Sequence, residues 1–388
     1  MYTWDITDAI TADVARIEEL RGSLDRGTLP RRWAGRLRRD LEAESTAAST
    51  SMEGVPVTVE EVRRILAGDR PATVSQADAR LVEGYRDAMS FVLRRADDPG
   101  FSWQTELFLG IHDRVLGGSY ASGAGRFRTG PVFVVVSGDA QAVYEPPAAD
   151  LVPGLMDDLA GFAQSDAGAI PPPVLAALVH VRLAGIHPFR DGNGRTARIL
   201  ASLAMYRGGF TRPEFTSLEE WWGAHRREYY DAFACLGTTW DSNADATPFI
   251  AAHVRAQCLQ VEALSLREAT DRVLWGILED LATEDLGLPP RVADGLFDAF
   301  FGRDVTNRYY RSLADVSVAT ATNDLAKLDA SGLLNAQGAG RSRLYTGSEA
   351  LMAAVTREAD LGDLPTASPI EVQRQWVMTR LAARVHGA

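Results

Sequence analysis

The twelve residues from 187 to 198 bring together the chemical groups that a phosphate-handling site would use. They are an imidazole, a carboxylate, two glycines and two guanidinium groups: His187, Asp191, Gly192, Gly194, Arg195 and Arg198. Because proline cannot continue a helix, Pro188 ends the apolar helix predicted over residues 174–186. The imidazole of His187 therefore stands at a helix end, where it can reach a reacting group.

The chain after this loop is predicted to be a second helix. Residues 195–206 are rich in Ala and Leu, lack the period-two alternation of a strand, and stop at Gly208. The loop glycines then lie at a helix N-terminus, whose free N–H groups and positive dipole end attract anions. Arg195 and Arg198 are three residues apart and share one helix face. A histidine before proline or an Asp-Gly pair is structural when it stands alone, but together these residues favour a phosphate site.

The segment resembles the signature of the Fic family, HPFx(D/E)GNGRxxR, and matches it at every specified position. The resemblance implies a protein that uses ATP and Mg²⁺ to attach AMP to a Ser, Thr or Tyr hydroxyl of a target protein. In that reaction His187 would be the general base and Asp191 would hold Mg²⁺. Gly192, Asn193 and Gly194 would line the anion hole.

The same resemblance assigns the nucleotide contacts. Arg195 would meet the β-phosphate and Arg198 the γ-phosphate, so that pyrophosphate is held as the leaving group. Residues 225–230 resemble the family's segment near the nucleoside pocket, which makes Tyr230 a residue that lines the base.

Two short β runs, residues 132–136 and 142–147, are joined by a turn and predict a hairpin upstream of the motif. From pattern alone, an ordinary edge hairpin packed on helices fits equally well. Its place before the motif favours the flap with which Fic proteins pin an extended target segment by strand addition. The resemblance therefore makes residues 132–145 the docking surface for a target protein.

A second set of residues, Ser49, Glu53 and Gly54, follows a run of helical composition at 36–48. Gly54 ends that helix, so the Glu53 carboxylate lies at the negative end of a helix dipole, where a nearby cation would relieve it. An arbitrary glutamate there would be a solvated last-turn residue. These three residues, however, match the Fic inhibitory motif (S/T)xxxE(G/N), in which the glutamate pairs with the second motif arginine, here Arg198. A bidentate contact would take Arg198 from the γ-phosphate, which implies autoinhibition.

Composition is that of a soluble protein: 388 residues, 46% hydrophobic and 24% charged, long enough for two or three domains. The net charge of −12 argues against a protein whose main task is coating nucleic acid. The most apolar run, around 174–186, is interrupted by His180 and Arg182, and the N-terminus has no basic region before an apolar one. We expect no membrane contact and a cytoplasmic location. Lys327 is the only lysine among 40 basic residues, which indicates an arginine-biased bacterial genome.

The C-terminal part has the order of a winged helix-turn-helix, a module that many Fic relatives carry. Residues 306–313 and 317–330 are short helical patterns, and residues 333–334 and 342–345 flank a glycine-rich turn. Residues 305–350 hold five basic side chains against four acidic ones, a net of +1, which is a poor set for phosphate contacts. Docking of a protein or of a second copy of this chain is at least as well supported as DNA binding.

We therefore predict a mainly α protein with a Fic helical core, a small β-hairpin flap and a C-terminal winged helix-turn-helix. The predicted regions are a helical part with the inhibitory helix at 1–100, the Fic core at 101–255, and a helical connector with the winged helix at 256–388. The predicted function is autoinhibited AMP transfer to proteins. Removal of AMP, or transfer of another nucleotide, is the alternative at the same site, and a DNA-binding transcriptional regulator is the alternative of another class.

Overall fold

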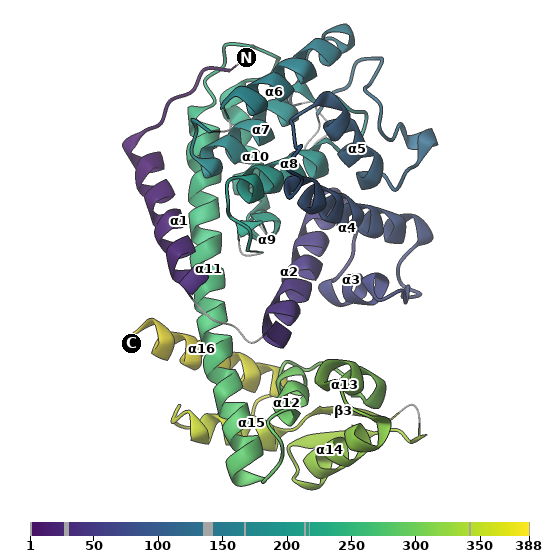
Figure 1. Ribbon diagram of the computed structural model, residues 1–388, viewed down its shortest axis with the longest axis vertical. Coiled ribbons are helices and arrows are strands. Elements are labelled where there is room, and N and C mark those ends of the chain that lie inside the picture. Colours follow the sequence, from purple (N-terminus) through teal and green to yellow (C-terminus); the bar gives the residue numbers. More distant parts are fainter. Residues whose placement is uncertain are drawn as a thin grey trace. The chain divides into compact units, whose positions relative to one another are not determined.

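The computed structural model describes residues 2–26, 31–134, 143–166, 168–212, 215–216, 218–340 and 343–387. By its internal contacts the chain divides into two compact units, Met1–Glu262 and Ala263–Ala388. Helices dominate both units (Figure 1), so the prediction of a mainly α protein is confirmed. The boundary predicted at residue 100 falls inside the first unit, and the predicted division into three regions stays a prediction.

The centre of the first unit is the pair of helices α7 (Pro172–Ile186) and α8 (Asn193–Arg207), which pack against each other (Figure 1). Nearly every side chain of α7 is buried, because the helix is apolar on all faces and other helices surround it. Helices α4 (Gln76–Ala96), α5 (Thr105–Val115) and α6 (Val152–Asp166) pack around this pair. Both helices lie where the sequence predicted them.

Local chemistry sets the ends of α7 and α8. Proline stands in the first turn of α7, where its missing N–H costs no hydrogen bond. The helix ends at His187, which adopts the left-handed conformation with φ +49°. Gly192, with φ +78°, precedes α8, and Gly208 follows its last residue. The loop of residues 187–192 therefore turns the chain between two fixed helix ends.

The N-terminal part of the first unit contains α1 (Asp8–Arg26), α2 (Arg31–Met52) and α3 (Val59–Leu66). A capping box starts α3: Glu61 N–H donates to Thr58 Oγ1 at 3.2 Å, and Thr58 N–H donates to Glu61 Oε2 at 2.9 Å. Helix α2 packs against α3, α4 and α9 (Leu218–Ala224). Glu53 and Gly54 follow the last residue of α2, as the sequence predicted.

The remaining elements of this unit are short, apart from one helix. Two 3₁₀ turns, η1 (Tyr120–Ser122) and η2 (Ala149–Leu151), precede α6. Helix α10 (Arg226–Asp231) leads into η4 (Ala232–Leu236), and α11 (Thr247–Asp280) begins in the first unit and continues into the second.

The structure describes the base of the predicted hairpin, where the two strands begin to pair. Val134 N–H donates to Tyr144 O at 2.9 Å and Val143 N–H donates to Val134 O at 2.8 Å, which is an antiparallel bridge. The predicted turn lies outside the described residues, since 135–142 are not among them. On its other side, Glu145 forms a parallel bridge with Thr239.

The second unit holds a three-stranded antiparallel sheet with the order β1 (Val305–Thr306), β3 (Leu344–Gly347) and β2 (Leu334–Gln337). Leu334 pairs with Gly347 and Gln337 with Leu344. The remaining elements are helical: η5 (Leu281–Asp285), α12 (Val292–Phe300), α13 (Asn307–Ala314), α14 (Val318–Ala330), α15 (Glu349–Glu358) and α16 (Ile370–His386). Helices α13 and α14 and strands β2 and β3 lie where predicted, and β1 is additional. Arg341 and Ser342, which were predicted to belong to the hairpin, lie outside the described residues.

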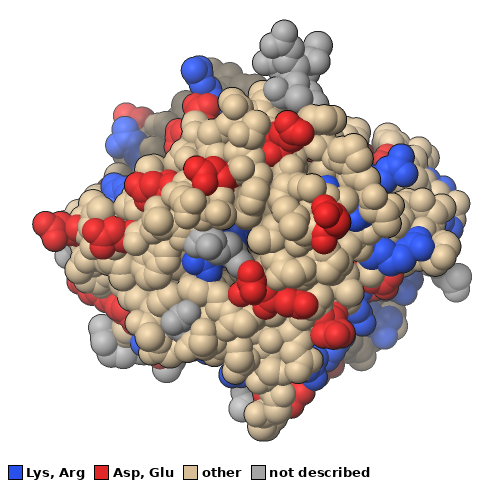
Figure 2. Space-filling view, turned by 90° about the horizontal axis from the view of Figure 1, so that it is seen from above, with Lys and Arg blue, Asp and Glu red and all other residues tan. Residues whose placement is uncertain are grey.

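Acidic and basic side chains are interspersed on the face shown in Figure 2, where neither sign forms a continuous field. Among the helices of the described ranges, none combines the length with the apolar composition that crossing a bilayer requires.

Candidate functional site

His187 stands at the C-terminal end of α7 with one ring nitrogen committed to the backbone. Its Nδ1 lies 3.3 Å from Ala184 O. Since a carbonyl only accepts, Nδ1 carries the proton of the neutral ring and Nε2 is the acceptor. Burial, and after it the cation of Arg128, lowers the pKa of His187 to about 4. The imidazole is therefore neutral near pH 7 and can take a proton through Nε2.

Arg128 holds the backbone that places His187. Its Nε donates to His187 O at 2.8 Å, and its own N–H donates to Pro188 O at 2.9 Å. Its Nη2 reaches Pro147 O at 2.5 Å, beyond the hairpin. A left-handed backbone conformation is energetically unfavourable for residues other than glycine. The hydrogen bonds from Arg128 therefore stabilise this conformation at His187.

The loop after His187 is held from inside by Phe189 and Asn193. The side-chain amide of Asn193 makes two hydrogen bonds to the backbone of Phe189. Its Oδ1 accepts from Phe189 N–H and its Nδ2 donates to Phe189 O, each at 2.9 Å. The ring of Phe189 stacks on His112 with centroids 3.6 Å apart. His112 accepts from Gly125 N–H at Nδ1, so its Nε2–H donates to Asp191 O at 2.9 Å. The Asn193 side chain is thus committed to Phe189, and only its backbone remains to line an anion hole.

Asp191 is the one predicted metal ligand, and its side chain is 61% exposed. Its Oδ1 accepts from Gly192 N–H at 2.6 Å and from Arg195 Nη2 at 3.3 Å. Among the residues that the structure describes, no group of three or more His, Cys, Asp or Glu side chains could form a metal cage. A single exposed carboxylate fits Mg²⁺, which proteins commonly bind through one or two carboxylates together with substrate phosphates.

Arg195 lies at the start of α8 between two carboxylates. Its Nη2 meets Asp191, and its Nε lies 4.0 Å from Glu53 Oε2. The residue is only 2% exposed, and its Nε and Nη1 atoms have no hydrogen-bond partner within the described part of the chain. Buried guanidinium donors without partners are suited to an anion that approaches the helix N-terminus.

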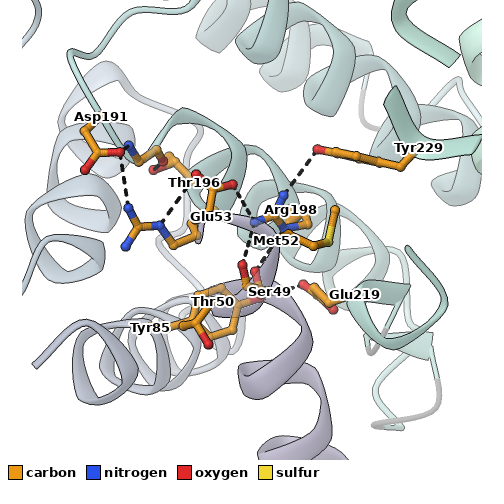
Figure 3. A network of polar contacts seen from close by, with 12 residues as sticks. Ser49, Thr50, Met52, Glu53, Tyr85, Asp191, Thr196, Arg198, Glu219 and Tyr229 are labelled. Carbon is orange, nitrogen blue, oxygen red and sulfur yellow. Dashed lines mark hydrogen bonds and ion pairs between the residues drawn. The ribbon is translucent and has the colours of Figure 1, made fainter. Parts of the chain in front are cut away.

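Arg198 is the hub of the network in Figure 3. Its Nη2 donates to Glu53 Oε1 at 2.9 Å and to Ser49 O at 3.1 Å, and its Nε donates to Ser49 Oγ at 2.9 Å. Its Nη1 reaches the hydroxyl of Tyr229 at 3.3 Å. The predicted pairing of Arg198 with Glu53 is present, but the expectation of a bidentate contact is wrong. Ser49 takes the second edge of the guanidinium because its oxygens face Arg198 from the preceding turn of α2.

Gly194 brings the Glu53 carboxylate close to α8. A Cβ atom at this position would lie 2.4 Å from Glu53 Oε1, well inside contact distance. The carboxylate therefore rests against the first turn of α8, between Arg195 and Arg198, at the positive end of the helix dipole. Gly192 and Gly54 instead adopt left-handed conformations, with φ +78° and +84°.

Tyr230, predicted to line the nucleotide base, donates its hydroxyl to Met52 O at 3.2 Å, at the end of α2. The structure thus brings Ser49, Glu53 and Tyr230 to the same end of α8 as the motif. Sequence reasoning overlooked Arg128, His112 and Tyr229. Tyr229 belongs to the segment 225–230 that the sequence did single out, and Arg128 lies four residues before the predicted hairpin, whereas nothing in the pattern marks His112.

Solved structures of Fic proteins share this fold. A Fic family protein from Desulfovibrio desulfuricans G20 is similar over 90% of this chain and 98% of its own, with a TM-score of 0.58 and 23% identity. Fic-1 from C. elegans is similar over 65% of this chain and 71% of its own, with a TM-score of 0.53 and 24% identity.

Curated relatives carry the name protein adenylyltransferase. The protein adenylyltransferase Fic of Nematostella vectensis is 29% identical over 221 residues, which are 56% of this chain and 48% of that protein. The protein adenylyltransferase fic-1 of Caenorhabditis elegans is 33% identical over 172 residues, 43% of this chain and 30% of that protein. The chain thus spans half or less of the length of these relatives. The sequence model of the Fic/DOC family matches residues 102–205, so the chain contains a Fic domain.

Proposed function

We propose that this chain transfers AMP from ATP to a hydroxyl group of a target protein, and that Glu53 restrains the transfer. The observation that carries the proposal is the Glu53 carboxylate at the first turn of α8, between Arg195 and Arg198. Here two guanidinium groups and a helix N-terminus surround one carboxylate. The same groups are suited to binding a phosphate. The neutral imidazole of His187 stands at the other end of the same loop.

In the proposed reaction, Nε2 of His187 accepts the proton of the target hydroxyl while the hydroxyl oxygen bonds to the α-phosphorus of ATP. The bond from that phosphorus to the oxygen shared with the β-phosphate breaks, and pyrophosphate leaves. Arg195 and the first N–H groups of α8 stabilise the negative charge of the leaving group, and Arg198 holds its far end. His187 then releases its proton to solvent.

Asp191 would hold Mg²⁺ through its exposed carboxylate, while Gly192 N–H and Arg195 fix the orientation of that carboxylate. Bound Mg²⁺ would offset the charge of the phosphates.

Restraint by Glu53 rests on the same contacts. While Nη2 of Arg198 donates to Glu53 and Nε donates to Ser49, the guanidinium is not available to a γ-phosphate. The Glu53 carboxylate would also repel a phosphate at the N-terminus of α8. ATP would then bind weakly or in an unproductive pose, and activity would require displacement of Glu53.

The hairpin is the proposed docking surface for the target. Val134 uses both its N–H and its carbonyl for Tyr144 and Val143, so only the outer edge of the first strand could accept another strand. Phe133, next to it, is 56% exposed and offers an apolar contact. Strand addition reads backbone more than side chains, which suits a target segment in extended conformation.

The first test incubates the purified chain, Glu53→Gly and Glu53→Gly/His187→Ala with a bacterial lysate and ATP labelled at the α-phosphate. We expect Glu53→Gly to raise labelling by roughly tenfold or more, since a hydrogen bond to a charged group contributes about 1.5–3 kcal/mol. The double variant should give no label. ATP labelled at the γ-phosphate is the matched control, because AMP transfer releases that phosphate.

Each other pattern of labelling points to an alternative. Label from the γ-phosphate would indicate phosphorylation. Loss of label from a previously modified target would indicate AMP removal, and labelling only with another nucleotide would correct the substrate. No label in any lane, with ATP binding retained, would contradict transfer.

DNA binding by the second unit is the less supported function. Arg343, one of the few basic side chains of the predicted winged module, pairs with Asp329 at 3.2 Å. Arg341 lies outside the described residues. A cation already paired within the protein has less to gain from a phosphate, which adds to the near-neutral balance of this segment.

A further inference from the structure

A small cavity lies behind Arg198, and neither Ser49 nor Glu53 is among the residues that line it. It is lined by residues of α7, α8, α9 and α11, among them His180, Arg198, Glu219, Trp222 and His253. Its volume is about 10 Å³, close to the smallest that admits one water molecule. All five of these side chains are at most 3% exposed.

Four of these side chains present polar atoms that have no hydrogen-bond partner within the described ranges. They are Glu219 Oε2, Trp222 Nε1, His180 Nδ1 and both ring nitrogens of His253. Leaving one such group buried and unsatisfied costs about 1–3 kcal/mol. Buried polar atoms in proteins are normally satisfied by protein or by ordered water, so this concentration around one cavity calls for an occupant.

The direction of the hydrogen bonds next to the cavity is fixed by chemistry. Arg198 has only donors, so its Nη1 donates to the hydroxyl of Tyr229 at 3.3 Å. We assign the single proton of Tyr229 to His180 Nε2, which lies 3.1 Å away, because this gives both the hydroxyl and the ring nitrogen a partner. His180 therefore carries its proton on Nδ1, and that N–H needs an acceptor.

One water molecule can provide partners for four of the five unpartnered atoms around the cavity. Trp222 Nε1–H and His180 Nδ1–H are donors, while Glu219 Oε2 and one nitrogen of His253 can accept. A water molecule accepts two hydrogen bonds and donates two, which leaves one His253 nitrogen unsatisfied. A metal ion fits less well, because no group of three metal-ligating side chains occurs in the described part of the chain.

We propose that this cavity binds an ordered water molecule, and that Tyr229 and His180 are positioning residues that hold the Arg198 guanidinium from behind. The water completes a chain of hydrogen bonds that runs from Arg198 through Tyr229 and His180 to side chains of α9 and α11. Glu219 also accepts a hydrogen bond at its Oε1 from the hydroxyl of Tyr85 on α4, at 2.7 Å. Figure 3 shows Tyr229 and Ser49 reaching Arg198 from different sides.

This support matters for the proposed function, on which the second half of the inference rests. Glu53 and Ser49 hold Arg198 only while α2 is in place. Once α2 is displaced and takes both Glu53 and Ser49 with it, the Tyr229 hydroxyl is the contact that keeps the guanidinium aimed at the γ-phosphate. ADP lacks that phosphate, so a loss of positioning should weaken the binding of ATP more than that of ADP.

A crystal structure of the full chain, at a resolution that shows ordered water, tests the cavity. We expect density for one water within hydrogen-bonding distance of Trp222 Nε1 and of at least one acceptor, Glu219 Oε2 or a His253 nitrogen. An empty cavity, or a metal ion in it, would overturn the water site.

Calorimetric binding of ATP and ADP tests the positioning. The background is Glu53→Gly/His187→Ala, which removes the carboxylate contact to Arg198 and prevents turnover. Adding Tyr229→Phe should lower the ratio of ATP to ADP affinity by roughly three- to tenfold, the effect of one hydrogen bond. His180→Phe should lower it in the same direction. Tyr310→Phe, which removes a buried tyrosine hydroxyl in the second unit, should leave the ratio unchanged.

Arg198→Ala in the same background separates the two proposals. If it lowers the ratio and Tyr229→Phe does not, the positioning role is overturned while the proposed function stands. If Arg198→Ala itself leaves the ratio unchanged, the γ-phosphate role in the proposed function is wrong and the positioning role falls with it. The crystal structure still decides the water site.

Discussion

At the scale of single residues, Arg198 shows how one guanidinium can be shared among three side chains. Its donors are divided among Glu53, Ser49 and Tyr229. In the proposed function, the contacts from Ser49 and Glu53 compete with the nucleotide, whereas Tyr229 approaches from another helix and does not. Restraint should therefore depend on Ser49 as well as on Glu53, and the two contributions can be measured apart.

Replacing Ser49 by Ala removes the hydroxyl that accepts from Arg198 Nε at 2.9 Å but keeps the Ser49 carbonyl contact. We expect AMP transfer to rise, but by less than in Glu53→Gly, since the hydroxyl carries no charge and the Ser49 carbonyl still accepts from Arg198. Ser51→Ala is the matched control, because Ser51 Oγ bonds Val57 O instead. Equal activity of Ser49→Ala and the unchanged chain would exclude a restraining role for this hydroxyl.

Arg128 is expected to act on catalysis through the backbone of His187. In the Glu53→Gly background, Arg128→Ala should lower kcat by about tenfold or more while ATP affinity changes little, because it leaves buried carbonyls without donors and loosens His187. Arg126→Ala is the control, since Arg126 packs on the exposed ring of Tyr120. Steady-state kinetics with ATP binding by calorimetry would separate the two effects. A fall in affinity with kcat retained would contradict the assignment.

At the scale of elements, the helices that frame the site meet at places where the sequence has no side chain. Gly84 of α4 faces the end of α5, and a Cβ there would lie 2.2 Å from Arg114 O. Backbone atoms cannot move aside as a flexible side chain can. This contact lets α4 reach both α5 and α8, and α5 in turn carries His112 to the loop of residues 187–192.

Gly84→Ala should therefore force α4 and α5 apart and lower the free energy of unfolding by about 1–3 kcal/mol or more. Gly110→Ala, within α5, is the matched control: its Cβ would meet nothing closer than 3.6 Å, and alanine favours a helix over glycine by about 1 kcal/mol. Urea denaturation of both variants measures the difference. If Gly84→Ala proved as stable as Gly110→Ala, the close approach of the two helices would be wrong.

At the scale of the whole molecule, buried histidines make stability depend on pH. Burial lowers the pKa of His112 to about 4 and that of His253 to about 3, from 6.5 in the unfolded chain. Between those values the unfolded state binds more protons than the folded one, so the free energy of unfolding falls as pH is lowered below about 6.5. Each histidine contributes at most about 1.4 kcal/mol per pH unit. Burial raises the pKa of Glu219, which acts in the opposite direction.

Urea denaturation should give a lower free energy of unfolding near pH 5 than near pH 7. Unfolding should be monitored with a probe in the first unit, because the two units need not unfold together. In His253→Phe the loss should be smaller, since phenylalanine takes up no proton. A pH dependence identical in the two proteins would show that His253 is not buried in its neutral form.

Sequence by itself determined the residues of the candidate site's loop and most helices of this protein. Residues 187–198 bring His187, Asp191, Arg195 and Arg198 into one loop and one helix start, because neighbours along a chain stay neighbours in the fold. Helix ends at Pro188, Gly192 and Gly208 follow from backbone rules that act over a few residues. The pairing of Glu53 with Arg198, 145 residues apart, was reached through family resemblance and not through spacing.

Only the tertiary structure decided how Arg198 is shared and what supports the loop. Ser49 takes one edge of the guanidinium because α2 presents it one turn before Glu53, which a motif cannot show. Arg128, His112 and Tyr229 come from three separate segments, and their roles depend on where packing brings them. The unpartnered atoms around the cavity behind Arg198 likewise follow from four helices that close around them. Such contacts depend on distances between residues far apart in the chain, which local patterns of sequence do not encode.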